Sequence, residues 1–151
     1  MSFFPEIAVG SQSDIAELRE PLHQLYTLSK MTQRIRWNMR GAIFLPLHET
    51  LRHFNKELIC HYDNIVEHIS TSEEGSHEFS RFIYGTVHLK NPPMNAAQLL
   101  LELRILSEQY HATVFTLNNT IIRLRDPAIR RMLRAISANL IRVKNAINGS
   151  I

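Results

Sequence analysis

The stretch NAAQLLLELRILSEQYHATVFTLNNTIIRLRDPAIRRML, residues 95–133, predicts two helices joined by a very short turn. Apolar residues recur at steps of three and four on both sides of the turn, which is the helical period. Asn95 with Gln98 three residues later is typical of a capping box, and Asp126 followed by Pro127 is typical of a second helix start. Because almost no linker separates the two segments, we expect antiparallel neighbouring helices.

The expected core faces of these two helices are continuous. The earlier helix presents Leu100, Leu103, Ser107, Tyr110, Val114, Leu117, Ile121 and Leu124. The later helix presents Ile129, Leu133, Ile136, Leu140, Val143 and Ile147.

The first half of the chain shows the same period over about residues 13–39 and 44–69. Pro21 lies inside the first segment, so that helix must either be kinked or start late, and Gly41 is expected to end it. Leu18, Leu22 and Leu25 share one face of the first helix. The second helix presents Leu47, Leu51, Phe54, Leu58, Tyr62, Ile65 and Ile69.

The connections between the helices predict the fold class. The link around Gly41 is short, whereas residues 70–94 are long enough to carry the chain back along a bundle, with room for a short helix over 77–84. Two helical hairpins joined by one long crossover are the ferritin-like connectivity among all-α four-helix bundles. We therefore expect one ferritin-like domain at 13–151 after an N-terminal extension at 1–12.

Composition narrows the cellular setting. The single cysteine, Cys60, excludes an internal disulfide framework, and no apolar run is long enough for a membrane span. The first residues lack the pattern of a secretion signal, so we expect a cytoplasmic protein with no membrane partner.

The charge is unevenly distributed. The net formal charge is +3, and no acidic residue follows Asp126. The basic residues beyond it are Arg130, Arg131, Arg134, Arg142 and Lys144. They form either an ordinary solvated helix face or a surface that attracts anions such as DNA.

The second helix carries a further stripe well away from its core face. Its members are His48, Arg52, Ile59, Asp63, Val66 and Glu67. Two aliphatic residues there favour packing against another subunit, since a helix in a monomeric bundle needs one apolar face, although they could also be stray aliphatics on a wet face. His48, Asp63 and Glu67 are candidate ligands of a metal such as iron; the alternative is that they are solvated charges.

Other candidate sites are weaker. The residues His53, Glu57, His61, Asn64 and His68 are interpreted as a solvent-facing polar edge rather than a metal or pH-sensing cluster. Glu108 and His111 match one half of an intra-bundle metal motif, but the last helix has no acidic residue to complete it. Cys60 is interpreted as a buried interface residue rather than a nucleophile.

At this point the residues resemble a known family. The run Arg36-Trp37-Asn38-Met39-Arg40-Gly41-Ala42-Ile43-Phe44, followed by His48, Asp63 and Glu67, is similar to the signature of the Dps mini-ferritins, with matching spacings. The resemblance implies a hollow dodecamer with a di-iron ferroxidase site between two-fold-related subunits. One subunit would supply two histidines and an aspartate, and its partner an aspartate and a glutamate.

Two of these five ligand positions depart from the family. Arg36 stands at the first histidine position, beside Trp37, and Arg52 stands at the first aspartate position. A guanidinium has no lone pair to offer iron, so we expect iron binding to be doubtful and ferroxidase activity to be weak or lost. The arginines could instead pair with Asp63 and Glu67 of a neighbour; alternatively, Arg36 reaches water from the helix end.

Three functions remain open from the sequence. The first is an iron-handling, stress-protective shell, the second is an inactive structural or DNA-associated shell, and the third is a small helical adaptor. Nothing basic precedes Arg19, so DNA binding through an N-terminal tail is disfavoured, and surface arginines of the last helix would have to replace it.

Overall fold

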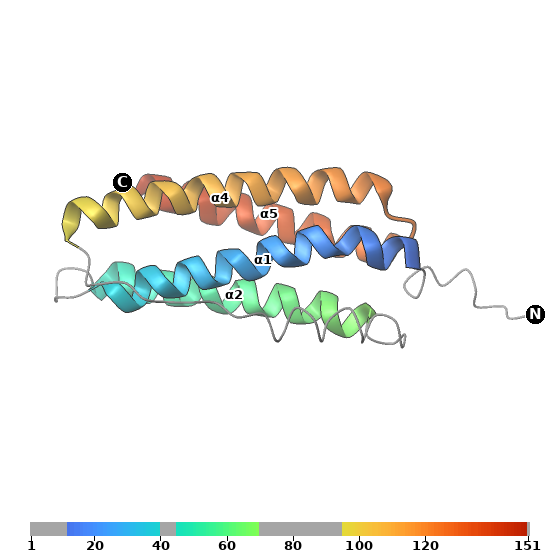
Figure 1. Ribbon diagram of the computed structural model, residues 1–151, viewed down its shortest axis with the longest axis horizontal. Coiled ribbons are helices and arrows are strands. Elements are labelled where there is room, and N and C mark those ends of the chain that lie inside the picture. Colours follow the sequence, from blue (N-terminus) through green and yellow to red (C-terminus); the bar gives the residue numbers. More distant parts are fainter. Residues whose placement is uncertain (1–11, 40–44, 70–94, 151) are drawn as a thin grey trace, which may run out of the picture.

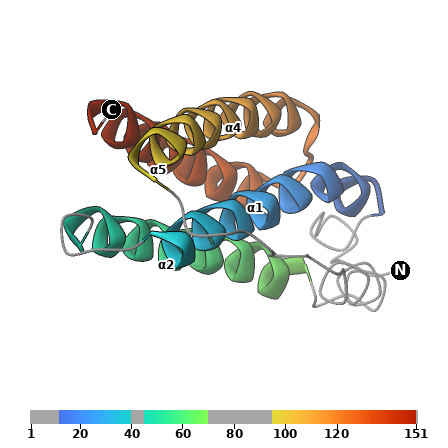
Figure 2. The same ribbon diagram turned by 60° about the vertical axis from the view of Figure 1, so that its left-hand side comes forward.

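The computed structural model describes residues 12–39, 45–69 and 95–150. Its helices are α1 (Gln12–Asn38), α2 (Leu45–Ile69), α4 (Ala96–Arg123) and α5 (Pro127–Gly149). Figures 1 and 2 show two antiparallel hairpins, α1 with α2 and α4 with α5, lying side by side along one axis. The described ranges contain no strand, so the predicted all-α four-helix bundle is confirmed.

The order of the helices matches the expected connectivity. α2 ends at the end of the bundle where α1 begins, whereas α4 begins at the opposite end (Figure 1). α2 and α4 therefore run in the same direction, which is the relation that a long crossover between them requires. The short helix expected over 77–84 and the break expected at Gly41 lie outside the described residues.

One hydrophobic core runs the length of the bundle. Every residue of the predicted α5 stripe is buried, and so are the members of the α4 stripe from Leu103 onward. The prediction for Leu100 is wrong, because this side chain is 38% exposed and Leu99 is buried instead. At about 100° per residue, Leu99 lies at the centre of the core face and Leu100 about a quarter-turn away from it.

Helix α1 runs through its proline. It begins at Gln12, before Pro21, so the late start offered by the sequence is wrong. The missing N–H of Pro21 removes the helical hydrogen bond to the carbonyl of Glu17. The side chain of Pro21 is buried, and the neighbouring Leu22 and Leu25 belong to the core.

The predicted starts of α4 and α5 are confirmed. Asn95 accepts a hydrogen bond from the backbone N–H of Gln98, and the Gln98 side chain accepts one from Asn95 in return. Asp126 accepts a hydrogen bond of 2.9 Å from the backbone N–H of Ala128, with Pro127 at the first helical position. Both helices thus begin where side-chain acceptors satisfy backbone donors that have no partner inside the helix.

A buried carboxylate ties the first turn of α1 to the α4–α5 turn. Asp14 is fully buried, and its two oxygens accept hydrogen bonds of 3.0 Å from the backbone N–H groups of Arg125 and Asp126. His68, in the last turn of α2, places Nε2 at 3.2 Å from Asp126 Oδ2. Parts of all four helices thus meet at this end of the bundle.

The polar edge expected on α2 faces α5 as well as solvent. Asn139 of α5 donates a hydrogen bond of 2.7 Å to Glu57, and its carbonyl oxygen lies 2.8 Å from Nε2 of His61. His53, in contrast, is exposed and lies 3.3 Å from the Glu57 carboxylate. The edge is therefore partly a polar contact between α2 and α5, because α5 lies on that side of α2.

Candidate inter-subunit site

The candidate site residues form two groups far apart in one chain. Arg36 lies in the last turn of α1, and His48 and Arg52 lie in the first turns of α2. Asp63 and Glu67 follow fifteen residues after His48 and Arg52, which is about 22 Å along the axis of α2. One chain therefore presents two half-sites, and a joint site requires a second chain.

The first half-site, Arg36, His48 and Arg52, contains polar atoms that the chain does not satisfy. Within the described residues, Nε of Arg36 and Nδ1 of His48 are buried and make no hydrogen bond. The Nδ1 atom of His48 lies 3.9 Å from Glu49 Oε1, and the exposed Arg52 guanidinium lies 3.8 Å from the same oxygen. The long contact of Arg52 leaves most of its donor groups available to a further acceptor, and the Nε of Arg36 is available as well.

The second half-site, Asp63 and Glu67, is open to solvent. Both side chains are exposed, and four residues separate them, so they project from the same face of α2. Ile59, on the same stripe, is 45% exposed, whereas Val66 is partly buried against the core. The stripe that the sequence assigned to subunit packing thus lies at the surface of the single chain.

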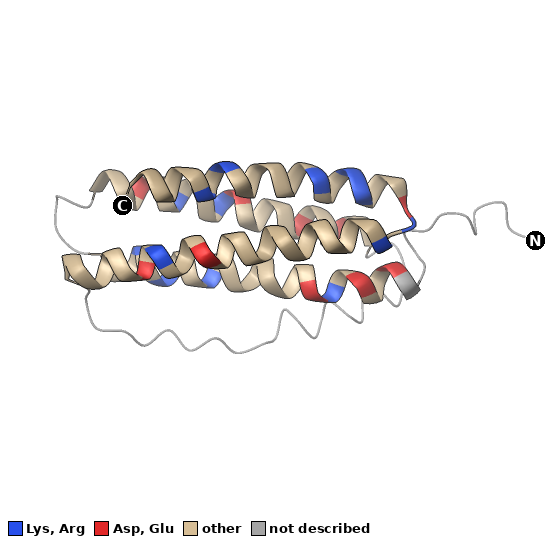
Figure 3. Cartoon of the chain, turned by 90° about the horizontal axis from the view of Figure 1, so that it is seen from above, with Lys and Arg blue, Asp and Glu red and all other residues tan. Residues whose placement is uncertain are grey.

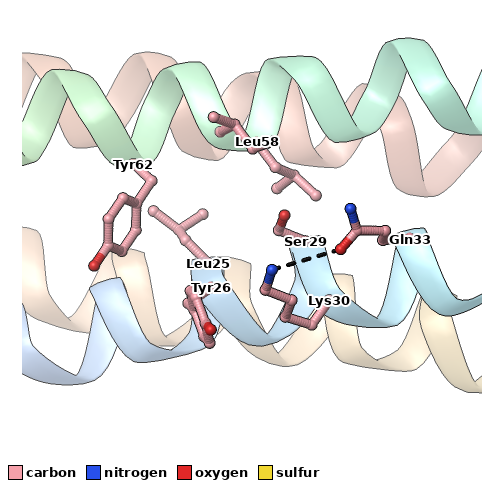
Figure 4. Close-up of a pocket in the computed structure, with 8 residues that line it drawn as sticks. Leu25, Tyr26, Ser29, Lys30, Gln33, Leu58 and Tyr62 are labelled. Carbon is pink, nitrogen blue, oxygen red and sulfur yellow. Dashed lines mark hydrogen bonds between the residues drawn. The ribbon is translucent and has the colours of Figure 1, made fainter. Parts of the chain in front are cut away.

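A shallow pocket lies between α1 and α2 beside this stripe (Figure 4). Its volume is about 170 Å³, and Leu25, Tyr26, Ser29, Lys30, Gln33, Leu58, Ile59 and Tyr62 line it. The ring centroids of Tyr26 and Tyr62 are 6.3 Å apart, and Nζ of Lys30 lies 5.3 Å from the Tyr26 centroid. Sequence reasoning missed the pocket because its walls come from two helices whose relative rotation the sequence does not reveal.

The electrostatics of Tyr62 connect the pocket to the second half-site. Partial burial raises the pKa of the Tyr62 phenol above its ordinary value, and the nearby Tyr26 and Asp63 add to the rise. The phenol therefore stays neutral at physiological pH beside the Asp63 carboxylate.

The donor atoms decide which ions the half-sites could hold. In the described part of the chain, no three His, Cys, Asp or Glu side chains are placed to bind a metal together. Across a two-fold seam, one imidazole and two carboxylates would meet two guanidinium groups, which repel cations and offer no lone pair. This set fits an ion-pair cluster better than a di-iron centre.

The remaining candidates lie elsewhere on the surface. Cys60 is exposed in the single chain, and Glu108 and His111 are exposed on α4. Lys144 of α5 lies 3.5 Å from Nδ1 of His111. No helix among the described ranges has the length and apolar content to span a membrane.

The basic residues of α5 are mostly exposed. Arg131, Arg134 and Arg142 are exposed, whereas Arg130 and Lys144 are partly buried. In Figure 3, basic residues recur along α5, while the neighbouring α4 carries charges of both signs. α5 has no acidic residue, so its surface has a single sign of charge.

Comparisons with known proteins agree with this architecture. No family model matches the chain. The DNA protection during starvation protein of Agrobacterium fabrum is 28% identical over 96 residues, which cover 64% of this chain and 59% of the relative. The match thus spans less than two thirds of the relative's length.

Solved structures share the whole bundle. DpsA14 from Streptomyces coelicolor has a TM-score of 0.71 at 19% identity, covering 95% of this chain and 85% of that one. Dps92 from Deinococcus radiodurans has a TM-score of 0.71 at 16% identity, with coverages of 91% and 85%. At these identities the structures establish the fold, and the Agrobacterium match adds a likeness in sequence. The chain therefore has the four-helix-bundle fold of solved Dps structures, and its sequence is similar to that of a DNA protection during starvation protein.

Proposed function

We propose that this chain assembles into a Dps-type shell whose inter-subunit seam is closed by arginine–carboxylate pairs, with ferroxidase activity weak or lost. A general role in iron storage and DNA protection is proposed from the family and from the name of the Agrobacterium relative. The observation that carries the proposal is Arg36. Its Nε is buried and has no hydrogen-bond partner among the described residues, and Arg36 stands where the family signature has an iron ligand.

The chemistry of the replaced ligands supports a loss of iron oxidation. Iron(II) needs lone-pair donors such as imidazole nitrogen or carboxylate oxygen. Arg36 and Arg52 keep their protons at any physiological pH, so neither can become a donor. The buried Nε of Arg36 also needs a hydrogen-bond acceptor, and a carboxylate of a second chain would supply one.

Two-fold symmetry would satisfy both half-sites at once. In an interface of this kind, residue i contacts residue j and residue j contacts residue i. The Arg36 and Arg52 guanidinium groups would then meet Asp63 and Glu67 of the partner subunit, and the same pairs would form again at the other end of α2. Asp63 and Glu67 would then place two carboxylates opposite the two guanidinium groups, beside Glu49, whose Oε1 already lies 3.8 Å from Arg52.

Restoring the ligands tests the proposal directly. The double variant Arg36→His, Arg52→Asp recreates the family ligand set and should oxidise iron(II) at least about ten-fold faster than the unchanged chain. The matched control, Arg131→His with Arg134→Asp, makes the same chemical changes on α5 and should oxidise iron(II) no faster. Oxygen consumption and iron content per chain are the measurements.

Two results would overturn the proposal. The unchanged chain could load two irons per seam and oxidise them at the rate of the double variant. The double variant could also assemble normally and still show no gain, which would mean that the five positions do not meet.

We propose a DNA-associated role as the second candidate, because α5 carries basic residues and no acidic one. A mobility shift that weakens steeply with salt is expected if the exposed arginines bind phosphates. The triple variant Arg131→Gln, Arg134→Gln, Arg142→Gln should reduce the shift, whereas Arg104→Gln on α4 should leave it unchanged. A shift that the triple variant retains in full would end this second proposal.

A further inference from the structure

Helix α4 carries a second apolar face that no helix of the described bundle covers. Its exposed members are Leu101 (58%), Ile105 (41%), Phe115 (66%) and Ile122 (80%). At about 100° per residue these side chains lie on one side of α4, roughly opposite its core face. Arg104, Glu108 and Asn119 are exposed on the same side, between the apolar residues. We call the four apolar residues the outer stripe.

We expect the outer stripe to be covered by another segment or molecule. Scattered surface hydrophobics are ordinary, but aligned large side chains along one helix mark an interaction surface. An amphipathic helix at the surface of a bundle needs only one apolar face, which α4 already has. The outer stripe does not take part in the half-sites on α1 and α2.

The chain before α1 has the composition to cover it. The first eleven residues lie outside the described ranges and include Phe3, Phe4, Ile7 and Val9, with Glu6 as their only charged side chain. Seven of the 151 residues are Phe, and two of them occur side by side here. A segment this apolar gains free energy by leaving water for a second apolar surface.

The position of α1 brings this segment to the C-terminal end of α4. Asp14 is hydrogen-bonded to the backbone of Arg125 and Asp126, directly after α4. Glu17 of α1 pairs with Arg123 of α4 at 2.9 Å. The chain therefore enters α1 beside Ile122, the most exposed member of the outer stripe.

The lengths also agree. From Ile122 back to Ile105 is seventeen residues of helix, or about 26 Å. From Phe3 to Gln12 is nine residues, which reach about 30 Å when extended. An extended segment laid parallel to α4 would bring Phe3 close to Ile105 and Ile7 close to Phe115, whereas Leu101 would lie at the limit of its reach.

We propose that residues 3–9 bind in extended form along the outer stripe of α4 of the same chain, as a strap that covers its exposed apolar side chains. The strap gives the apolar N-terminal segment a role within the fold, in place of the DNA-binding tail that its sequence disfavours.

Cysteine cross-linking in the full-length assembled protein tests the strap. In a Cys60→Ser background, Phe3→Cys with Ile105→Cys should form an intrachain disulfide under mild oxidation, seen as a faster-migrating monomer on non-reducing gels. The control pair, Phe3→Cys with Lys56→Cys on α2, should form about ten-fold less because no binding raises its local concentration.

A second measurement is needed because the cysteine substitutions could themselves weaken the packing of residues 3–9 on α4. The variant Phe4→Ser, Ile7→Ser leaves the outer stripe intact. Because it should uncover one apolar patch, it should increase the fluorescence of a dye that binds apolar surfaces by roughly two-fold or more. The further change Phe115→Ser should remove most of that increase.

Three outcomes would overturn the strap. Equal cross-linking by the test and control pairs would mean that the segment is not bound to α4. Disulfide-linked dimers from Ile105→Cys alone, together with no intrachain disulfide from the Phe3→Cys, Ile105→Cys pair, would assign the outer stripe to a second copy. Unchanged dye fluorescence in Phe4→Ser, Ile7→Ser would mean that residues 3–9 do not cover the stripe.

Discussion

The residues that bear on function lie at the end of α1 and at the two ends of α2. Arg36 and Arg52 replace lone-pair donors by fixed cations, while His48, Asp63 and Glu67 retain the family pattern. The sequence could predict this substitution, because residue identity at each spacing is visible without a structure. It could not predict that Arg36 Nε is buried with no partner in the described part of the chain, because that depends on how α1 and α2 pack.

Asp14 provides a prediction about stability at the residue scale. Asp14→Ala removes the acceptor of two backbone N–H groups at a buried position, so the free energy of unfolding should fall by about 3 kcal/mol. Urea unfolding followed by circular dichroism measures this. The control Glu108→Ala removes an exposed carboxylate of α4 and should leave the midpoint nearly unchanged; equal effects would contradict the structural role of Asp14.

Tyr110 provides a prediction about alkaline pH. Complete burial raises the pKa of its phenol well above the ordinary value, because the phenolate would lose its hydration. Below about pH 10 both the folded and the unfolded chain keep the proton, and above it the unfolded chain releases its proton first. Stability that depends on Tyr110 is therefore present at neutral pH and is lost as the pH rises past 10.

The test compares Tyr110→Phe with the unchanged chain. The ring remains in the core, but the ionisable group is gone, so the fall in urea midpoint between about pH 8 and pH 11 should be smaller in the variant. Absorbance at the tyrosinate band should show that Tyr110 ionises only when the circular dichroism signal of the helices is lost. Ionisation of all tyrosines in the folded state would refute the prediction.

At the scale of helices, sequence periodicity predicted most of what the bundle shows. Every predicted core residue of α5 is buried, and both N-terminal caps form as expected, because these features depend on local spacing. The polar edge of α2 was misjudged because a helical wheel gives the angle of each side chain but not which neighbour lies there. The outer stripe of α4 was overlooked because its members interleave with an equally apolar core face.

The α2–α5 contact provides an element-scale prediction. Asn139 is 7% exposed and links Glu57 to His61, so its carbonyl oxygen faces a His61 Nε2 that carries the hydrogen. Asn139→Ala should lower the free energy of unfolding by about 1–2 kcal/mol. The control Asn145→Ala, on the exposed face of α5, gives the same gain in helix propensity and should not lower the free energy of unfolding. Nitrogen NMR of the His61 imidazole would report its tautomer.

At the scale of the whole molecule, the fold makes sense as part of an assembly. One chain holds two half-sites about 22 Å apart along α2, and neither is complete by itself. This separation explains why the sequence could point to ligands but not to a site.

Assembly mass provides the corresponding prediction. Light scattering should give a particle near 210 kDa, twelve times the 17.5 kDa chain, rather than a monomer. Asp63→Asn with Glu67→Gln removes the carboxylates expected to meet the arginines and should shift the particle toward smaller species. Glu20→Gln with Glu108→Gln makes the same change in net charge at exposed positions of α1 and α4. Dissociation by both double variants alike would contradict a specific seam.

The carboxylate of Asp14 has a consequence for synthesis of the chain. Its donors, at Arg125 and Asp126, stand 111 and 112 positions later. A nascent polypeptide exposes Asp14 early, while the groups that will hold it have not yet been translated. Until Arg125 and Asp126 are translated, the Asp14 carboxylate is more stable in water than buried. The first turn of α1 is therefore expected to pack into the bundle only after most of the chain has been synthesised.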